Sequence, residues 1–187
     1  MRKSVVFALF LVLSAAPLLL AQAPSAPSVT QAADQSLSGG EREFTSLAEA
    51  MPDDKFDYAP TNGEFKGVRN FGQQVTHVGA TNYMIAAALL GEKIPVDIGK
   101  GENGPDLKTK ADKINFLKES FAYLHKAFAT VNKDNIDGQV ANPFGGKTKP
   151  TRLSLIMLAV AHPFDHYGQM VEYARANGII PPASRGQ

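Results

Sequence analysis

The chain has 187 residues, with 19 basic and 18 acidic side chains, four histidines and no cysteine. This length is typical of one domain, and a share of 44% apolar residues is enough to bury a core. The lack of cysteine excludes disulfides, a thiolate nucleophile, Cys-ligated zinc and iron–sulfur clusters, so a bound metal needs imidazole or oxygen ligands. A formal net charge of +1 argues against a large nucleic-acid interface, and we expect no nucleic-acid partner.

Residues 1–23 have the pattern of a secretory signal peptide. A basic start is followed by an apolar run and by small residues that end at Ala21 and Ala23. A retained N-terminal anchor is the alternative, but the run contains Ser14 and Pro17 and is shorter than the ~20 residues of a membrane span. We therefore expect cleavage after Ala21 or Ala23, export to the periplasm or the extracellular space, and no stable membrane span after cleavage.

The segment that follows predicts a linker and a first helix. Residues 24–35 are rich in Ala, Pro, Ser and Gln, and they form either a flexible linker or the start of this helix. Apolar or small residues at helical spacing continue to Met51, and Pro52 ends the run. Gly39 and Gly40 each cost about 1 kcal/mol relative to Ala, which argues against a helix over the N-terminal half.

Three further helices have clearer boundaries. The second follows a capping-box pattern at Asn70 and Gln73 and stops at Gly91. The third is predicted over residues 110–131 and the fourth over residues 152–177, each behind a threonine cap.

These elements predict an all-α fold. Four amphipathic helices without strand patterns pack most simply as a four-helix bundle, which we assign to one domain over residues 36–187. The fourth helix is apolar on nearly every side from Leu153 to Val160, so we expect it to be the innermost of the four.

Two histidines of the fourth helix have the spacing of metal ligands. His162 and His166 are four residues apart, which places both imidazoles on one helix face. A third ligand has to come from another helix, and His77 in the second turn of the second helix is the candidate. Pro163 and Gly168 break local helix rules around the pair, as residues at functional sites often do. Ordinary packing of each histidine, with a simple bend or a new helix start at Pro163, is the alternative.

Other polar residues near the pair have less specific signals. Gln169 lies three residues after His166 on the same helix face, so it is the first candidate for a residue that orients an imidazole. Asp165 and Glu172 are available as general bases, but nothing ties either one to the site, and the catalytic residues remain unassigned. His125 has no second histidine at helical spacing, and we interpret it as a residue at the core boundary.

At this point the sequence resembles the DinB/YfiT-like superfamily of metal-dependent proteins. The stretch over residues 162–169 is similar to the family signature H-x-x-x-H-x-G-Q, and the Pro-Pro tail that follows also matches. The stretch from Phe71 to His77 resembles the helix-two segment that carries the family histidine. The similarity extends over residues 44–184, strongly in the fourth helix and loosely in the first.

The resemblance implies a bundle in up-down-down-up order and a divalent metal, either nickel, zinc or iron, held by His77, His162 and His166. It also implies that a homodimer is common and that some relatives transfer low-molecular-weight thiols. Such thiols are cytosolic reagents, so an export signal argues against this activity here.

The expected function is therefore an exported metal-dependent enzyme with a small-molecule substrate. Three imidazole ligands leave coordination positions open, and such a metal acts as a Lewis acid that lowers the pKa of bound water to about 7. Hydrolysis is the simplest reaction compatible with export. The alternatives are a non-catalytic metal- or ligand-binding bundle, a bundle whose histidines pack without metal, and a thiol-transferase-like activity.

Overall fold

The computed structural model describes residues 26–100 and 103–186, so the predicted signal peptide lies outside the described residues. Four long helices form a bundle: α1 (Val29–Ala50), α2 (Phe71–Leu90), α3 (Lys110–Phe128) and α4 (Arg152–Ala176). Two short 3-10 helices, η1 (Asp53–Lys55) and η2 (Pro182–Ser184), follow α1 and α4. The described residues contain no strand, which confirms the predicted all-α class.

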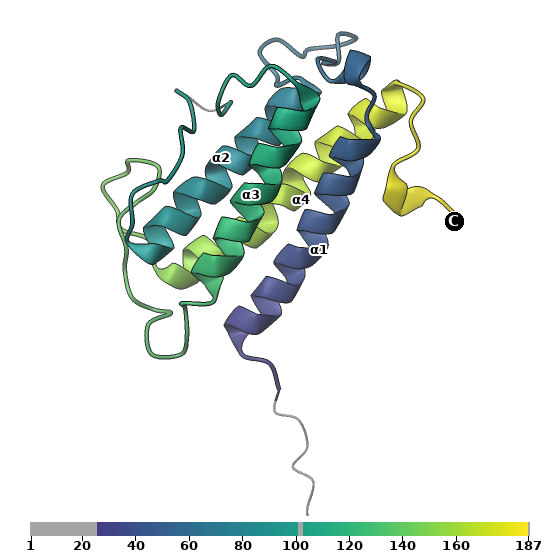
Figure 1. Ribbon diagram of the computed structural model, residues 1–187. Coiled ribbons are helices and arrows are strands. Elements are labelled where there is room, and N and C mark those ends of the chain that lie inside the picture. Colours follow the sequence, from purple (N-terminus) through teal and green to yellow (C-terminus); the bar gives the residue numbers. More distant parts are fainter. Residues whose placement is uncertain (1–25, 101–102, 187) are drawn as a thin grey trace, which may run out of the picture.

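The helices follow the predicted up-down-down-up order. In Figure 1, α1 and α4 run in one direction, and α2 and α3 run in the other. The main neighbours of α2 are α3 and α4, and those of α1 are α4 and α3. Because α2 and α3 are parallel, the connection over residues 91–109 has to return along the length of the bundle.

Local capping sets the ends of the helices as the sequence predicts. Asn70 Oδ1 accepts a hydrogen bond from the Gln73 backbone N–H, and the Gln73 side chain accepts one from the Asn70 N–H. This reciprocal pair fixes the start of α2, and Gly91 ends the helix in a left-handed conformation with φ of 71°. The third and fourth helices begin where expected, and α3 ends three residues earlier than predicted.

The prediction against a helical N-terminal half of α1 is wrong. The helix begins at Val29 and continues through Gly39 and Gly40, behind a capping box formed by Ser28 and Gln31. A Cβ on Gly40 would lie 3.2 Å from the Phe164 ring on α4, so the missing side chain allows the two helices to approach. Tertiary packing therefore outweighs the low helix propensity of glycine.

The expectation that α4 is the innermost helix is also wrong. Met157 on α4 is 64% exposed, whereas 15 of the 20 residues of α2 are buried. Small residues let the neighbours approach α2 closely, because a Cβ on Gly79 would lie only 2.7 Å from the Phe116 ring on α3. An apolar run alone does not distinguish a central helix from a peripheral one, since many apolar side chains stay at the surface.

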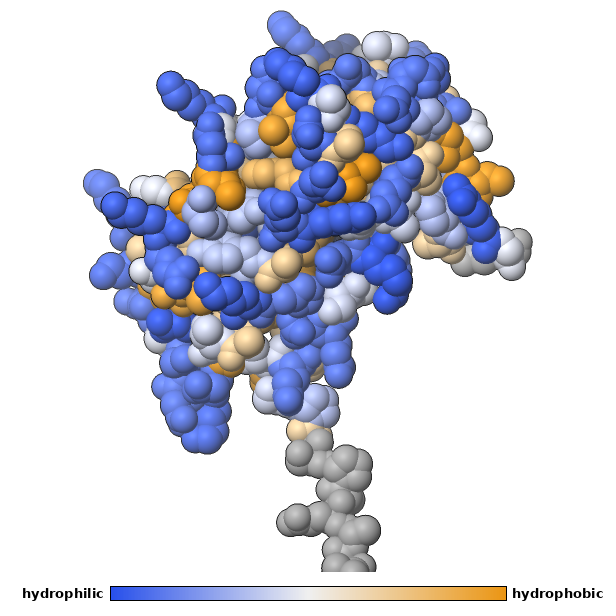
Figure 2. Space-filling view, in the orientation of Figure 1, coloured by the Kyte–Doolittle hydropathy of each residue, from blue (hydrophilic) through white to orange (hydrophobic). Residues whose placement is uncertain are grey.

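Apolar side chains from all four helices form the main core, with Phe44, Phe71, Phe121 and Phe128 among its largest fully buried members. The face in Figure 2 is mainly hydrophilic, and its hydrophobic residues form small separate patches. Within the described residues, we find no helix that is both long and apolar enough to cross a membrane.

Candidate metal centre

Three histidines converge between α2 and α4. The Nε2 atom of His162 lies 3.1 Å from Nε2 of His77 and 3.1 Å from Nε2 of His166. One ring nitrogen from each residue lies within 4.8 Å of the other two. His166 is buried, and the other two are partly exposed, so the cluster lies where the core meets the surface.

This arrangement fits one cation. Metal–imidazole bonds are about 2.0–2.1 Å long, so two nitrogens on one ion lie about 2.9–3.4 Å apart in octahedral or tetrahedral coordination. The two separations that involve His162, both 3.1 Å, fall in this range, and the third pair of ring nitrogens lies within 4.8 Å. The structure thus brings together the three residues that the sequence singles out as ligands.

A glutamine that the sequence analysis missed contacts the cluster. His166 Nδ1 lies 2.6 Å from Oε1 of Gln74, so the ring donates to the amide oxygen from this nitrogen. The protonated Nδ1 leaves the lone pair on Nε2, which faces the other histidines. Gln74 lies three residues before His77 on α2, and a polar side chain on this buried face is the signal that identifies it.

Gln169 supports this glutamine, and its side-chain hydrogen bonds among the described residues go to Gln74 and Asp165. Its Oε1 accepts a hydrogen bond of 3.0 Å from Nε2 of Gln74, and its own Nε2 donates to Asp165 over 3.3 Å. The chain of contacts therefore runs from Asp165 through Gln169 and Gln74 to His166. Gln169 acts one hydrogen bond further from the ring than the sequence suggests.

Burial keeps two of the imidazoles neutral. It lowers the pKa of His162 to about 3, with added repulsion from His166 and His77. Burial also lowers the pKa of His166 to about 4, and the nearby Arg69 contributes a smaller effect in the same direction. At neutral pH these rings therefore carry lone pairs that a cation can use without displacing a proton.

The outer nitrogen of His162 differs from that of His166. Its Nδ1 atom is buried and has no hydrogen-bond partner among the described residues. The protein therefore fixes the tautomer of His166 through Gln74, whereas no hydrogen bond among the described residues holds His162 in the Nδ1–H form that a cation on Nε2 would select.

A pocket of about 460 Å³ begins at the cluster, because His77 forms part of its wall. Its other lining residues come from α2 and from the two long connections: Ala80, Thr81, Met84, Ile98, Gly99 and Phe144. There is therefore room for a ligand next to His77, although His162 and His166 are not among the lining residues.

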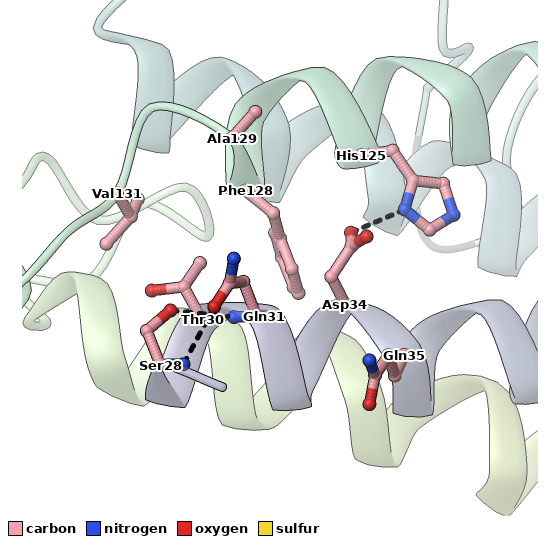
Figure 3. A pocket seen from close by; sticks show the side chains of 9 residues that line it. All are labelled: Ser28, Thr30, Gln31, Asp34, Gln35, His125, Phe128, Ala129 and Val131. Carbon is pink, nitrogen blue, oxygen red and sulfur yellow. Dashed lines mark hydrogen bonds and ion pairs between the residues drawn. The ribbon is translucent and has the colours of Figure 1, made fainter. Parts of the chain in front are cut away.

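His125 lies apart from the cluster, on α3. Its Nδ1 is 2.6 Å from the Asp34 carboxylate and its Nε2 is 3.0 Å from Glu41, both on α1. The contact with Glu41, helped by Asp34, raises the pKa of His125 to about 9 despite partial burial. Figure 3 shows Asp34 pointing to His125 beside a separate pocket of about 610 Å³, so this histidine is a charged link between helices.

The fold and the cluster define a class: an α-helical bundle with three histidines from two helices around one point. The sequence matches the DinB superfamily over residues 36–170, and the chain belongs to this family. Among curated proteins, none matches the sequence at a significant level.

Solved structures of DinB-like proteins have the same fold. A protein from Bacillus cereus superposes with a TM-score of 0.65 at 15% identity, over 83% of this chain and 96% of its own. A protein from Bacillus subtilis gives a TM-score of 0.58 at 18% identity, over 79% and 92%. The colibactin self-resistance protein ClbS, in complex with double-stranded DNA, gives 0.58 at 15% identity, over 81% and 98%.

The last of these structures corrects one expectation. Near-neutral charge led us to expect no nucleic-acid partner, but a protein of this fold has been crystallised with double-stranded DNA. A low formal net charge describes the whole chain and is silent on how charges are distributed over one face. It therefore does not exclude nucleic acid, and the expectation is wrong.

Proposed function

We propose that this protein is a metal-dependent enzyme whose divalent cation is held by His77, His162 and His166, with hydrolysis as its reaction class. The observation that carries the proposal is that His162 Nε2 lies 3.1 Å from Nε2 of both His77 and His166, in a cluster whose ring nitrogens all lie within 4.8 Å of one another. Nickel, zinc and iron all accept imidazole ligands. The pocket beside His77 favours an open catalytic site over a closed structural one.

Each protein group has a defined task in this proposal. When bound, the cation supplies Lewis acidity and activates water at neutral pH. Gln74 accepts the Nδ1 proton of His166 and so keeps the ring in the tautomer that a ligand needs. Gln169 holds the amide of Gln74 in the orientation that makes this contact.

The test is metal analysis of the purified full chain before and after reconstitution with zinc. We expect one ion per chain in the wild-type protein and a loss of this ion in His166→Ala. His125→Gln is the matched control, because it removes a histidine outside the cluster and should leave the metal content unchanged. A metal content well below one per chain after reconstitution, unaltered in His166→Ala, would refute the proposal.

Export of the enzyme belongs to the same proposal and rests on the signal-peptide pattern of residues 1–23. The mass of the mature protein, recovered from a host with a secretion system, measures this directly. A mass that corresponds to cleavage after Ala21 or Ala23 supports export. An uncleaved N-terminus in the cytoplasmic fraction contradicts it.

Double-stranded DNA is a second candidate partner, favoured by the DNA complex of a neighbour with the same fold. Fluorescence anisotropy with a labelled duplex at low and high salt tests it. Binding that weakens steeply as salt rises indicates contacts with phosphates, whereas an unchanged anisotropy at both salt concentrations rejects this candidate.

A further inference from the structure

The pocket beside the cluster follows one face of α2. His77, Ala80, Thr81 and Met84 have the spacing i, i+3, i+4 and i+7, which places their side chains in one row. At 1.5 Å per residue, the row extends about 10 Å from the histidine cluster. The pocket is therefore elongated, with a metal-ligand candidate at one end.

The two long connections complete its walls. Ile98 and Gly99 belong to the return connection between α2 and α3, and Phe144 belongs to the connection between α3 and α4. Phe144 is 50% exposed, so its ring is accessible to a molecule that enters the pocket. The side chains that these connections add to the pocket, Ile98 and Phe144, are both apolar.

The chemistry of the lining selects for an uncharged occupant. Among the described lining residues, only His77 and Thr81 have polar side chains, and none is a lysine, an arginine or a carboxylate. A phosphate, a carboxylate or an ammonium group in this space would lose its hydration without gaining an ion pair, which is unfavourable. A hydrocarbon chain or an aromatic ring has no such hydration to lose, and burying its apolar surface in the pocket is favourable.

We infer that the enzyme acts on a neutral substrate with an apolar chain or ring, which lies along α2 while the polar group to be attacked lies at the histidines. This inference rests on the proposed function, because it assigns the substrate class of the same site. A medium-chain or aryl ester or amide has the required chemistry.

The test measures how ligand tails affect binding to the zinc-loaded full chain. Straight-chain hydroxamates from acetohydroxamate to octanohydroxamate offer a constant metal-binding group with a growing tail, and calorimetry gives their dissociation constants. We expect about fourfold tighter binding per methylene until the pocket is full. A hydroxamate with a terminal carboxylate should bind more weakly than the neutral ligand of the same length.

Two phenylalanine variants locate the effect. Phe144→Ala should reduce the gain per methylene, whereas Phe65→Ala, a control at a residue 42% exposed outside the pocket, should leave it unchanged. Both variants should retain one zinc ion per chain, because neither residue belongs to the cluster.

The outcomes separate the two proposals. If the wild-type protein takes up one zinc ion but binds all tails equally, or prefers the charged tail, the substrate class is wrong and the metal site stands. If it takes up no zinc, the proposed function fails and this inference falls with it.

Discussion

Raising the pH should weaken the packing of α1 against α3, because His125 on α3 bridges Asp34 and Glu41 on α1. The contact with Glu41, with help from Asp34, raises the pKa of His125 from 6.5 to about 9. Because His125 binds its proton more tightly in the folded state, protonation stabilises the folded protein. This contribution is complete below 6.5, the pKa of His125 in the unfolded chain. This stabilisation declines as the pH rises from 6.5 and is lost above a pH of about 9.

The magnitude follows from the pKa difference and from solvent exposure. At about 1.36 kcal/mol per pKa unit, the rise in the pKa of His125 from 6.5 to about 9 is equivalent to about 3 kcal/mol. The Asp34 and Glu41 side chains are 42% and 32% exposed, so water screens both carboxylates. We therefore expect the link to contribute only about 1 kcal/mol to the free energy of unfolding. In a domain of this size that is about 2–4 °C in Tm.

Urea unfolding of the metal-free wild-type protein and of His125→Gln measures this contribution. The wild type should be more stable than the variant by about 1 kcal/mol at pH about 6, and the gap should close at pH about 10. Groups that titrate elsewhere affect both proteins alike and cancel in the difference. A gap of equal size at both pH values would refute the reasoning, because it would show that His125 contributes by packing alone.

Urea unfolding and metal-affinity measurements test three further consequences of the packing and of the cluster. Gly79→Ala should lower the free energy of unfolding by about 1–3 kcal/mol, because the new Cβ would lie 2.7 Å from the Phe116 ring. A Cβ added at Gly168 would meet no atom within 4 Å, so Gly168→Ala should raise the free energy of unfolding by about 0.5–1 kcal/mol. Urea titrations that show a stabilised Gly79→Ala or a destabilised Gly168→Ala would contradict the respective expectation. Gln74→Ala should weaken zinc binding by about 10–100-fold through the lost contact with His166, and an unchanged affinity in competition with a chelator would show that this contact is dispensable.

The histidine cluster was predictable because it depends on helix periodicity. His162 and His166 share a face in any helix that continues through Pro163, and α4 does so. His77 lies in a helix whose start is fixed by its own capping box, so its position along the bundle follows from local sequence. The fold class follows from the same periodic patterns.

What the sequence could not reveal depends on the rotation of each helix and on long-range contacts. Gln73 and Gln74 are adjacent and chemically identical, yet the first caps α2 and the second contacts His166. The capping-box spacing assigns Gln73, whereas the contact of Gln74 with His166 depends on how α2 is rotated relative to α4. The link from His125 to Asp34 was equally inaccessible, because the carboxylate lies in the part of α1 that glycine propensity argued against.

The parallel course of α2 and α3 has a consequence for how this protein can diverge. The return connection over residues 91–109 contributes Ile98 and Gly99 to the pocket, while the three histidines belong to helices. Insertions, deletions or exchanges in this connection can therefore reshape one wall while the bundle and the histidine cluster keep their positions. If the three histidines hold a metal as proposed, a library confined to the connection would vary the pocket wall at Ile98 and Gly99 and leave both the α2 wall and the proposed ligands in place.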